Sequence, residues 1–247
     1  QRADAMLLYQ PMKISSLLKF MGIEVKKANK IQMSASQGEL QYPKHPIEIE
    51  KVALEKIEPP LNIIMLVSES MRFDLLTPEI MPNLFSFAQR HLHFKQHYSG
   101  GNGTRQGLFS LFYGLQGNYW DMFLRNKRGP VLFNVLNEYH YEYFIYTGAN
   151  FSYPELDQTI FSQIPKDKLI ENNQGEPWKR DEINTTALLD KLNSHNKNKA
   201  YFGFIFYEST HARYSFAENS IIRHDYLKNL DYAGLSRQEL APQITGM

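Results

Sequence analysis

The sequence predicts an α/β fold in which a mainly parallel sheet carries helices on both faces. Three short apolar runs, at 61–67, 143–146 and 201–207, are separated by segments with helical spacing. The runs lack polar alternation, which is typical of strands buried on both faces of a parallel sheet. The order strand, helix, strand, helix, strand is the pattern of α/β domains.

The first 60 residues differ in character from the rest of the chain. They are polar and irregular, with one stretch of helical spacing at 14–21 that ends before Gly22. Four prolines then interrupt a charged stretch: Pro43, Pro46, Pro59 and Pro60. We therefore expect residues 1–60 to be an arm or linker that packs on a domain spanning residues 61–247.

Four helices are expected between the predicted strands. Helical spacing of apolar residues marks the segments 82–91, 105–113, 131–139 and 181–192. Pro82 suits the first turn of its helix, and Asp181 suits the N-terminal cap of the last one.

Composition excludes several classes of protein. The 247 residues include 27 Lys and Arg against 26 Asp and Glu, so the net charge of +1 offers no basic surface for general nucleic-acid binding. The chain has no Cys, which excludes disulfides, thiolate zinc sites and cysteine nucleophiles. No apolar run approaches the roughly 20 residues of a membrane span. Because the chain starts at Gln1 and its last residues do not resemble a natural end, we expect it to be a fragment of a longer protein.

Polar clusters follow the predicted strands, where α/β domains bind their ligands. Glu69 comes directly after the first strand, and a carboxylate there needs a cation partner, either a metal ion or Arg72. The alternative is a Glu that caps the following turn. Thr104 opens a helix after the glycines of 99–103, a place that favours a phosphate and where a metal could turn the hydroxyl into a nucleophile. The alternative is an ordinary helix cap.

The third cluster is 208–214, after the last predicted strand. His211 could bind a metal or a phosphoryl oxygen, and Arg213 could pair with the same anion. The alternative is a structural histidine. Each signal is weak alone, but three clusters at the ends of three predicted strands indicate one active site.

The motifs resemble the alkaline phosphatase/sulfatase superfamily. The run 62–70 (NIIMLVSES), the tetrapeptide 81–84 (MPNL) and the glycine-rich 101–104 (GNGT) are similar to the start of its lipoteichoic acid synthases, phosphoethanolamine transferases and YejM (PbgA) inner-membrane proteins. The similarity to the YejM branch extends furthest, through 107–114 (GLFSLFYG) and the arm.

The resemblance implies a function and its residues. Glu69 and Thr104 match a metal ligand and a nucleophile of the transferases, with Thr104 also on the metal. His211 and Arg105 would hold substrate oxygens, and the cofactor would be Mn²⁺, Zn²⁺ or Mg²⁺. The implied protein is a membrane-anchored phosphoryl hydrolase or transferase in the inner membrane of a Gram-negative bacterium, with this domain in the periplasm. Its partners would be membrane lipid or lipid head groups, such as lipopolysaccharide, and a membrane protein is a further candidate.

Two departures from the family pattern leave alternatives open. The chain has no Asp-His dipeptide, so we expect its metal site to be incomplete, the fragment alone to be inactive and the last strands of the sheet to be absent. Thr147 stands where glycerol-phosphate transferases place a His. The alternative function is a non-catalytic domain that binds lipid or lipopolysaccharide, with Glu69 and Thr104 as relics. Basic residues of the arm would then face the lipid: Lys13, Lys19, Lys26 and Lys27. A purely structural α/β domain is the third option.

Overall fold

The computed structural model describes residues 42–43, 61–211 and 215–217. In this part the sheet has four parallel strands in the order β1-β4-β2-β3. The strands are β1 (Ile63–Ser68), β2 (Glu142–Thr147), β3 (Leu169–Glu171) and β4 (Tyr201–Tyr207). The predicted parallel α/β fold is therefore confirmed. The helix predicted at 14–21 and most of the arm lie outside the described residues.

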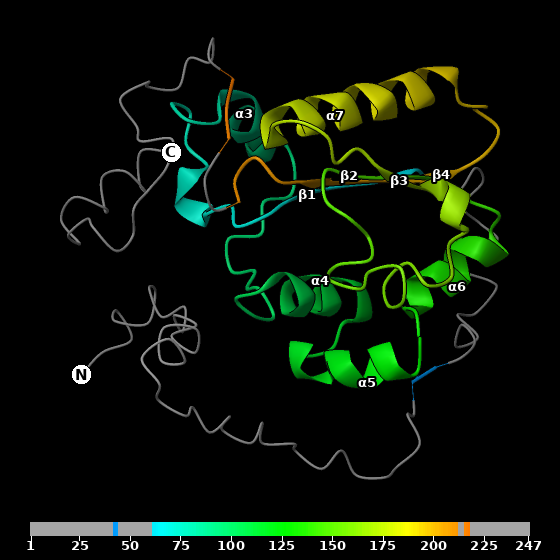
Figure 1. Cartoon of the computed structure of the whole chain (residues 1–247). Coiled ribbons are helices and arrows are strands. Elements are labelled where there is room, and N and C mark those ends of the chain that lie inside the picture. The colour runs from blue at the N-terminus through cyan, green and yellow to red at the C-terminus, as the bar shows by residue number, and fades with distance from the viewer. Residues whose placement is uncertain (1–41, 44–60, 212–214, 218–247) are drawn as a thin grey trace, which may run out of the picture. The chain divides into compact units, whose positions relative to one another are not determined.

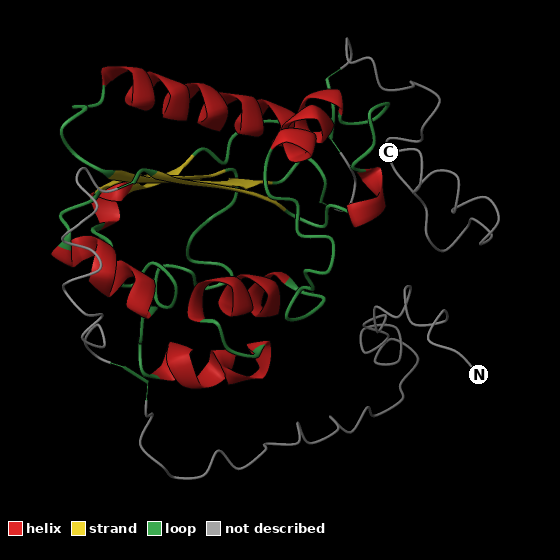
Figure 2. Cartoon of the chain, turned by 180° about the vertical axis from the view of Figure 1, so that it is seen from behind, coloured by secondary structure: helices red, strands yellow, loops and turns green. Residues whose placement is uncertain are grey.

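Helices cover both faces of the sheet (Figures 1 and 2). Those on one face are α3 (Pro82–Arg90) and α7 (Pro177–Ser194), and those on the other are α4 (Thr104–Tyr113), α5 (Trp120–Arg125) and α6 (Val131–Glu138). Single 3₁₀ turns occur at Phe73–Leu75, Gly117–Tyr119 and Lys166–Lys168. The predicted α3, α4 and α6 agree with the structure to within one residue at each end.

The core between the sheet and the α4–α6 face is aromatic. Phe133 and Phe204 are fully buried, and Phe161 is 1% exposed. The ring of Phe161 contacts those of Phe112, Phe133 and Phe204 at centroid distances of 5.7, 5.6 and 5.1 Å. Edge and tilted contacts of this kind add to the free energy gained from burial. The core holds β4 and α4 in fixed relative positions, and both elements contribute residues to the cavity discussed below.

Three features differ from the sequence prediction. The strand β1 is not buried on both faces within the described part of the chain, because Ile64 and Leu66 are 44% and 59% exposed and β1 pairs there with β4 alone. The helix α7 begins at Pro177, so Asp181 lies inside it and is not its cap. The elements β3 and α5 were not predicted, since three and six residues are too few for a clear periodicity.

One point of the segment before β1 is fixed on the α4–α6 face. The Tyr42 ring contacts Phe123 and Tyr113 at centroid distances of 4.9 and 5.8 Å. Its hydroxyl accepts a hydrogen bond of 3.2 Å from the main-chain N–H of Val131, which starts α6 and has no partner within that helix. Arg128 donates to the carbonyl of Pro43, and its guanidinium lies 5.8 Å from the centre of the Tyr42 ring.

Candidate active site

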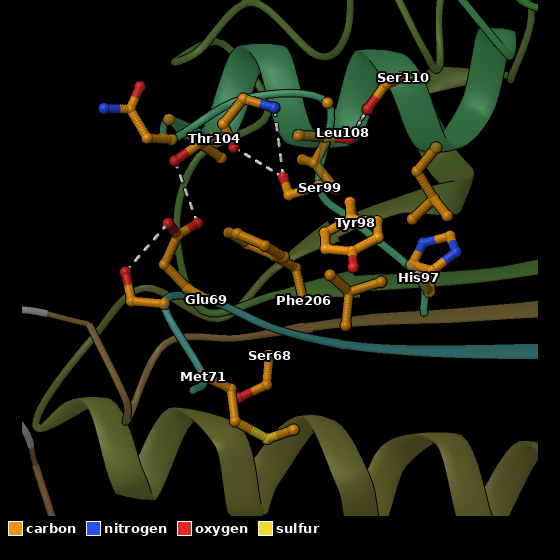
Figure 3. A pocket seen from close by; sticks show the side chains of 18 residues that line it. Ser68, Glu69, Met71, His97, Tyr98, Ser99, Thr104, Leu108, Ser110 and Phe206 are labelled. Atoms are coloured by element: carbon orange, nitrogen blue, oxygen red, sulfur yellow. Dashed lines mark hydrogen bonds between the residues drawn. The ribbon is translucent and has the colours of Figure 1, made fainter. Parts of the chain in front are cut away.

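A cavity of about 620 Å³ lies where β1 ends and α4 begins (Figure 3). Its walls come from the end of β1 (67–71), the loop and helix start at 97–104, and one face of α4, with Phe206 of β4 on the sheet side. Figure 3 shows Glu69 and Thr104 facing each other at one end of the cavity and the rings of Tyr98 and Phe206 beside them. The wall combines apolar and aromatic side chains with polar groups, as in many ligand sites, and His97 and Ser110 lie at the other end of the cavity from Glu69 and Thr104 (Figure 3).

Glu69 and Thr104 are in direct contact. The Thr104 hydroxyl donates a hydrogen bond of 3.0 Å to Oε2 of Glu69, and the Ser70 hydroxyl donates one of 3.4 Å to Oε1. Two residues that are 35 positions apart in the sequence thus share one site. The sheet explains the position of Glu69, because its N–H donates to the Tyr207 carbonyl at 3.0 Å and so extends the β1–β4 pairing by one residue.

The side chain of Thr104 does not cap α4, which was the alternative interpretation of this residue. Gly103 is the N-cap of α4, Thr104 is the first helical residue, and no side chain caps the helix. The hydroxyl of Thr104 is bound to Glu69. The first amides of α4 point away from the helix without intrahelical partners, which favours an anion near Thr104.

The glycines before α4 permit a close approach of the loop to the helix. A Cβ atom on Gly100 would lie 2.1 Å from the Ser110 hydroxyl oxygen, and one on Gly101 would lie 2.5 Å from Cβ of Gln106. The Ser99 hydroxyl donates to the Gly101 carbonyl at 2.6 Å and closes the loop on itself. The loop therefore lies against α4, which brings its main chain to the cavity wall.

Arg105 and His211 are not among the residues that line this cavity. Arg105 donates from Nε and Nη2 to the two carboxylate oxygens of Glu155, at 2.9 and 2.8 Å, and stacks 5.2 Å from the centre of the exposed Tyr153 ring. His211 is exposed, and its main-chain N–H donates to the Glu208 carbonyl at 2.9 Å. Of the four predicted site residues, the structure brings Glu69 and Thr104 together and places the other two outside the cavity wall.

A second polar cluster, formed between α7 and residues 208–209, was not predicted. The carboxylate of Asp181 on α7 accepts hydrogen bonds from the main-chain N–H groups of Glu208 and Ser209 at 3.0 and 2.8 Å, and from the Ser209 hydroxyl. Arg180 forms an ion pair of 3.2 Å with Glu208 and donates to the Gly148 carbonyl at 2.6 Å. The sequence pointed to segment 208–214 but gave no sign that α7 holds it.

The electrostatics of this cluster concentrate on Glu208. Burial raises its pKa above the ordinary 4.5, and the nearby carboxylates of Asp181 and Glu69 add to this effect. The positive charges of Arg180 and His211 oppose it. Glu208 therefore keeps its proton to a higher pH than an exposed glutamate does.

The described residues give partial support to the predicted divalent metal site at Glu69 and Thr104. Glu69 and Thr104 offer two neighbouring oxygens, a donor type that suits Mg²⁺ or Mn²⁺. Among the residues that the structure describes, no three His, Asp or Glu side chains come together as a metal site. These residues therefore do not complete a metal site. The pair His224-Asp225, which has the reverse order of the family's Asp-His dipeptide, lies outside the described part. Thr147, which stands at a family His position, is 1% exposed, and its Oγ1 accepts a hydrogen bond of 3.0 Å from the N–H of Ala149.

Comparison with known proteins identifies the family. The sulfatase family profile matches residues 61–225, two thirds of the chain. The chain belongs to the sulfatase family. This confirms the predicted superfamily, and the matched range covers the whole described sheet and both Glu69 and Thr104. Sulfatase domains generally use a divalent metal.

Some proteins that are similar in sequence to this chain are inner membrane proteins. An uncharacterized protein of Haemophilus influenzae is 29% identical over 174 residues, which are 70% of this chain and 29% of that protein. The inner membrane proteins YejM of Salmonella typhimurium and Salmonella typhi are 28% identical over 103 residues, 42% of this chain and 17% of theirs. The chain thus spans less than a third of the length of these relatives. Among the described residues, no helix is long and apolar enough to cross a membrane.

Proposed function

We propose that the chain is the sulfatase-like domain of a membrane-anchored, metal-dependent phosphoryl hydrolase or transferase. Thr104 would be the nucleophile, and the substrates would be phosphate esters of envelope lipids or their head groups. The observation that supports this most directly is the hydrogen bond between Thr104 and Glu69 at the wall of a cavity large enough for a head group. Membership in the sulfatase family and the similarity to YejM inner membrane proteins support it further. In this proposal the protein is anchored in the inner membrane, and the domain lies in the periplasm.

The proposed reaction proceeds in two steps. Oγ1 of Thr104 loses its proton and forms a bond to phosphorus while the bond from phosphorus to the ester oxygen breaks, and the departing alkoxide takes up one proton to leave as the alcohol, so the two proton transfers balance. The resulting phosphothreonine then passes its phosphoryl group to water or to an acceptor hydroxyl, which restores the Thr104 hydroxyl.

The chain's own residues prepare the first step. The bond to Glu69 orients the Thr104 hydroxyl, and the free amides at the start of α4 favour the substrate's negative charge. A divalent cation, with Mn²⁺, Zn²⁺ and Mg²⁺ as candidates, would supply charge neutralisation and a lower hydroxyl pKa. In this proposal Glu69 and Thr104 provide two of its ligands, and residues outside the described part provide the others.

Two further residues belong to the proposal as substrate-binding groups. His211 sits just beyond β4 and would bind a non-bridging phosphoryl oxygen. Arg105 would do so through Nη1, because Glu155 engages its Nε and Nη2. Neither lines the cavity, so an extended head group would have to reach past the cavity mouth to meet them.

The proposal is tested on the whole periplasmic part of the parent protein, extended past Met247. The measurements are bound metal and hydrolysis of a soluble phosphomonoester and phosphodiester. Thr104→Ala and Glu69→Ala should each reduce turnover by about 100-fold or more. The control is Ser194→Ala, which removes a hydroxyl in the last turn of α7 that donates to the Asp190 carbonyl at 2.8 Å, outside the cavity wall, and should retain most of the activity.

Unchanged phosphate release by Thr104→Ala would refute the assignment of the nucleophile. A folded protein without metal and without turnover would refute the catalytic proposal. In that case salt-sensitive binding to anionic lipid vesicles would favour the regulatory, lipid-binding alternative.

A further inference from the structure

Glu69 is held at every polar atom it has. Its N–H donates to the Tyr207 carbonyl, and its carbonyl accepts a hydrogen bond from the Thr210 hydroxyl. Its two carboxylate oxygens accept hydrogen bonds from Ser70 and Thr104. The position of a side chain depends on the position of its own main chain. The two main-chain hydrogen bonds of Glu69 therefore matter as much as the two at its carboxylate.

The two main-chain bonds have different origins. The bond to Tyr207 continues the β1–β4 ladder, whose last register pair is Ser68 with Tyr207. The bond from Thr210 is made by a side chain from beyond the end of β4, where the ladder has ended. Thr210 also shares a hydrogen bond of 2.9 Å with the hydroxyl of Ser68. Because a hydroxyl carries one hydrogen and Thr210 gives its own to Glu69, Ser68 is the donor in that bond.

The backbone after Glu69 needs such support. Ser70 has a φ of 56°, in the left-handed region that is unfavourable for residues other than glycine. Strained conformations of this kind persist when the surrounding contacts determine them, and they gather at functional sites. The Thr210 bond acts on the carbonyl that directly precedes Ser70, so it restrains the strained peptide from its amino side.

Thr210 is itself held in place from α7. The buried carboxylate of Asp181 binds the N–H groups of Glu208 and Ser209 and the Ser209 hydroxyl. The His211 N–H donates to the Glu208 carbonyl and closes the turn around Thr210. A continuous set of hydrogen bonds therefore runs from α7 through segment 208–210 to Glu69 and on to Thr104.

We propose that Thr210 is a positioning residue whose hydroxyl fixes the main chain of Glu69, so that the carboxylate meets the Thr104 hydroxyl. Asp181 supports it by fixing the turn from which Thr210 projects. The role of Thr210 in catalysis rests on the proposed function, whereas its effect on the geometry of Glu69 does not.

The test compares Thr210→Val, which keeps the shape of the side chain but loses the hydroxyl, with Thr210→Ser, which keeps the hydroxyl. The control is Ser194→Ala, because the Ser194 hydroxyl also donates to a main-chain carbonyl, that of Asp190, at 2.8 Å, and Ser194 does not line the cavity. Amide hydrogen exchange is measured on the 247-residue chain. Losing one hydrogen bond in Thr210→Val should speed exchange at Glu69 and Ser70 about 2- to 10-fold, and Thr210→Ser should restore it.

The kinetic measurement is made on the extended parent protein with soluble phosphoesters. Thr210→Val should lower kcat by about tenfold or more with little change in KM, because a misplaced carboxylate affects the reacting groups and not the binding of the substrate. Thr210→Ser should recover the rate, and Ser194→Ala should leave it near the wild-type value.

The outcomes separate the two proposals. Exchange at Glu69 and Ser70 that is the same in Thr210→Val as in the wild type would overturn the positioning role, whatever the kinetics. A wild-type parent without turnover would overturn the proposed function, and the exchange result would still decide the role of Thr210. Should Thr210→Val not fold, Asp181→Asn weakens the same chain of bonds from its other end. Faster exchange at both Ser209 and Glu69 would then support the role, and faster exchange at Ser209 alone would overturn it.

Discussion

Replacement of Tyr42 tests how firmly the segment before β1 is attached to the domain. Tyr42→Ala removes two aromatic contacts, with Phe123 at 4.9 Å and with Tyr113 at 5.8 Å. Such contacts contribute about 0.5–1.5 kcal/mol each. It also removes the hydrogen bond to the N–H of Val131, with a net contribution of about 0.5–1.5 kcal/mol. Together these terms predict a loss of about 1.5–4.5 kcal/mol in the free energy of unfolding.

A second variant divides this loss between its causes. Tyr42→Phe keeps the ring and loses only the hydroxyl, so it should cost about 1 kcal/mol. Both variants should speed hydrogen exchange at the Val131 amide, since this N–H starts α6 and has no partner within the helix. Urea unfolding followed by circular dichroism measures the free energies. Tyr119→Ala is the control, because Tyr119 is 45% exposed and its loss should cost less than about 0.5 kcal/mol.

A small effect of Tyr42→Ala on stability would contradict this prediction. If Tyr42→Ala unfolds within about 0.5 kcal/mol of the wild type, with the Val131 amide exchanging as before, Tyr42 does not dock on α4–α6 in solution. The expectation that the arm packs on the domain would then lose its main support among the described residues, and the hydrogen bond from Arg128 to the Pro43 carbonyl would remain. A large loss in Tyr42→Ala with none in Tyr42→Phe would instead assign the whole effect to the ring contacts.

The remaining predictions concern the core and the buried carboxylate. Phe133→Ala should lower the free energy of unfolding by about 3–5 kcal/mol, because this ring is fully buried, and urea unfolding should show no comparable loss for Phe94→Ala, where the ring is 71% exposed. The raised pKa of Glu208 means that the folded state binds its proton more tightly than the unfolded state, so the contribution of Glu208 to stability should fall as the pH rises above 4.5. Glu208→Gln should show a smaller fall in urea titrations over that pH range, and an unchanged slope would contradict the assignment.

The sheet and most helices could be predicted because their signals are local. The apolar runs at β2 and β4 reflect burial on both faces, and the helix periods reflect one buried side, so both patterns are written within a few residues. The apolar run of β1 has the same pattern, yet Ile64 and Leu66 are exposed in the described part. Burial depends on which elements pack against a strand, and the strand's own sequence does not specify them. The short β3 and α5 have too few residues to carry a period.

The candidate site divides in the same way. Glu69 and Thr104 were predicted because each follows a local landmark, a strand end and a glycine-rich helix start, and because strand ends meet at one edge of a parallel sheet. Arg105, next to Thr104, was expected to hold substrate oxygens, but its side chain turns to Glu155, 50 residues away in the sequence. The sequence could not show which of two neighbouring side chains faces the cavity.

The sequence by itself therefore determined the family and the α/β fold and marked Glu69 and Thr104 as candidate site residues, because those depend on patterns that lie close together along the chain. Only the tertiary structure decided what holds that pair in place. Asp181 was expected to cap its helix, and folding instead turns its carboxylate to the amides of Glu208 and Ser209. The hydrogen bond from Thr210 to Glu69 spans 141 positions, and a hydroxyl has no preference for so distant a partner until the strands bring the two together.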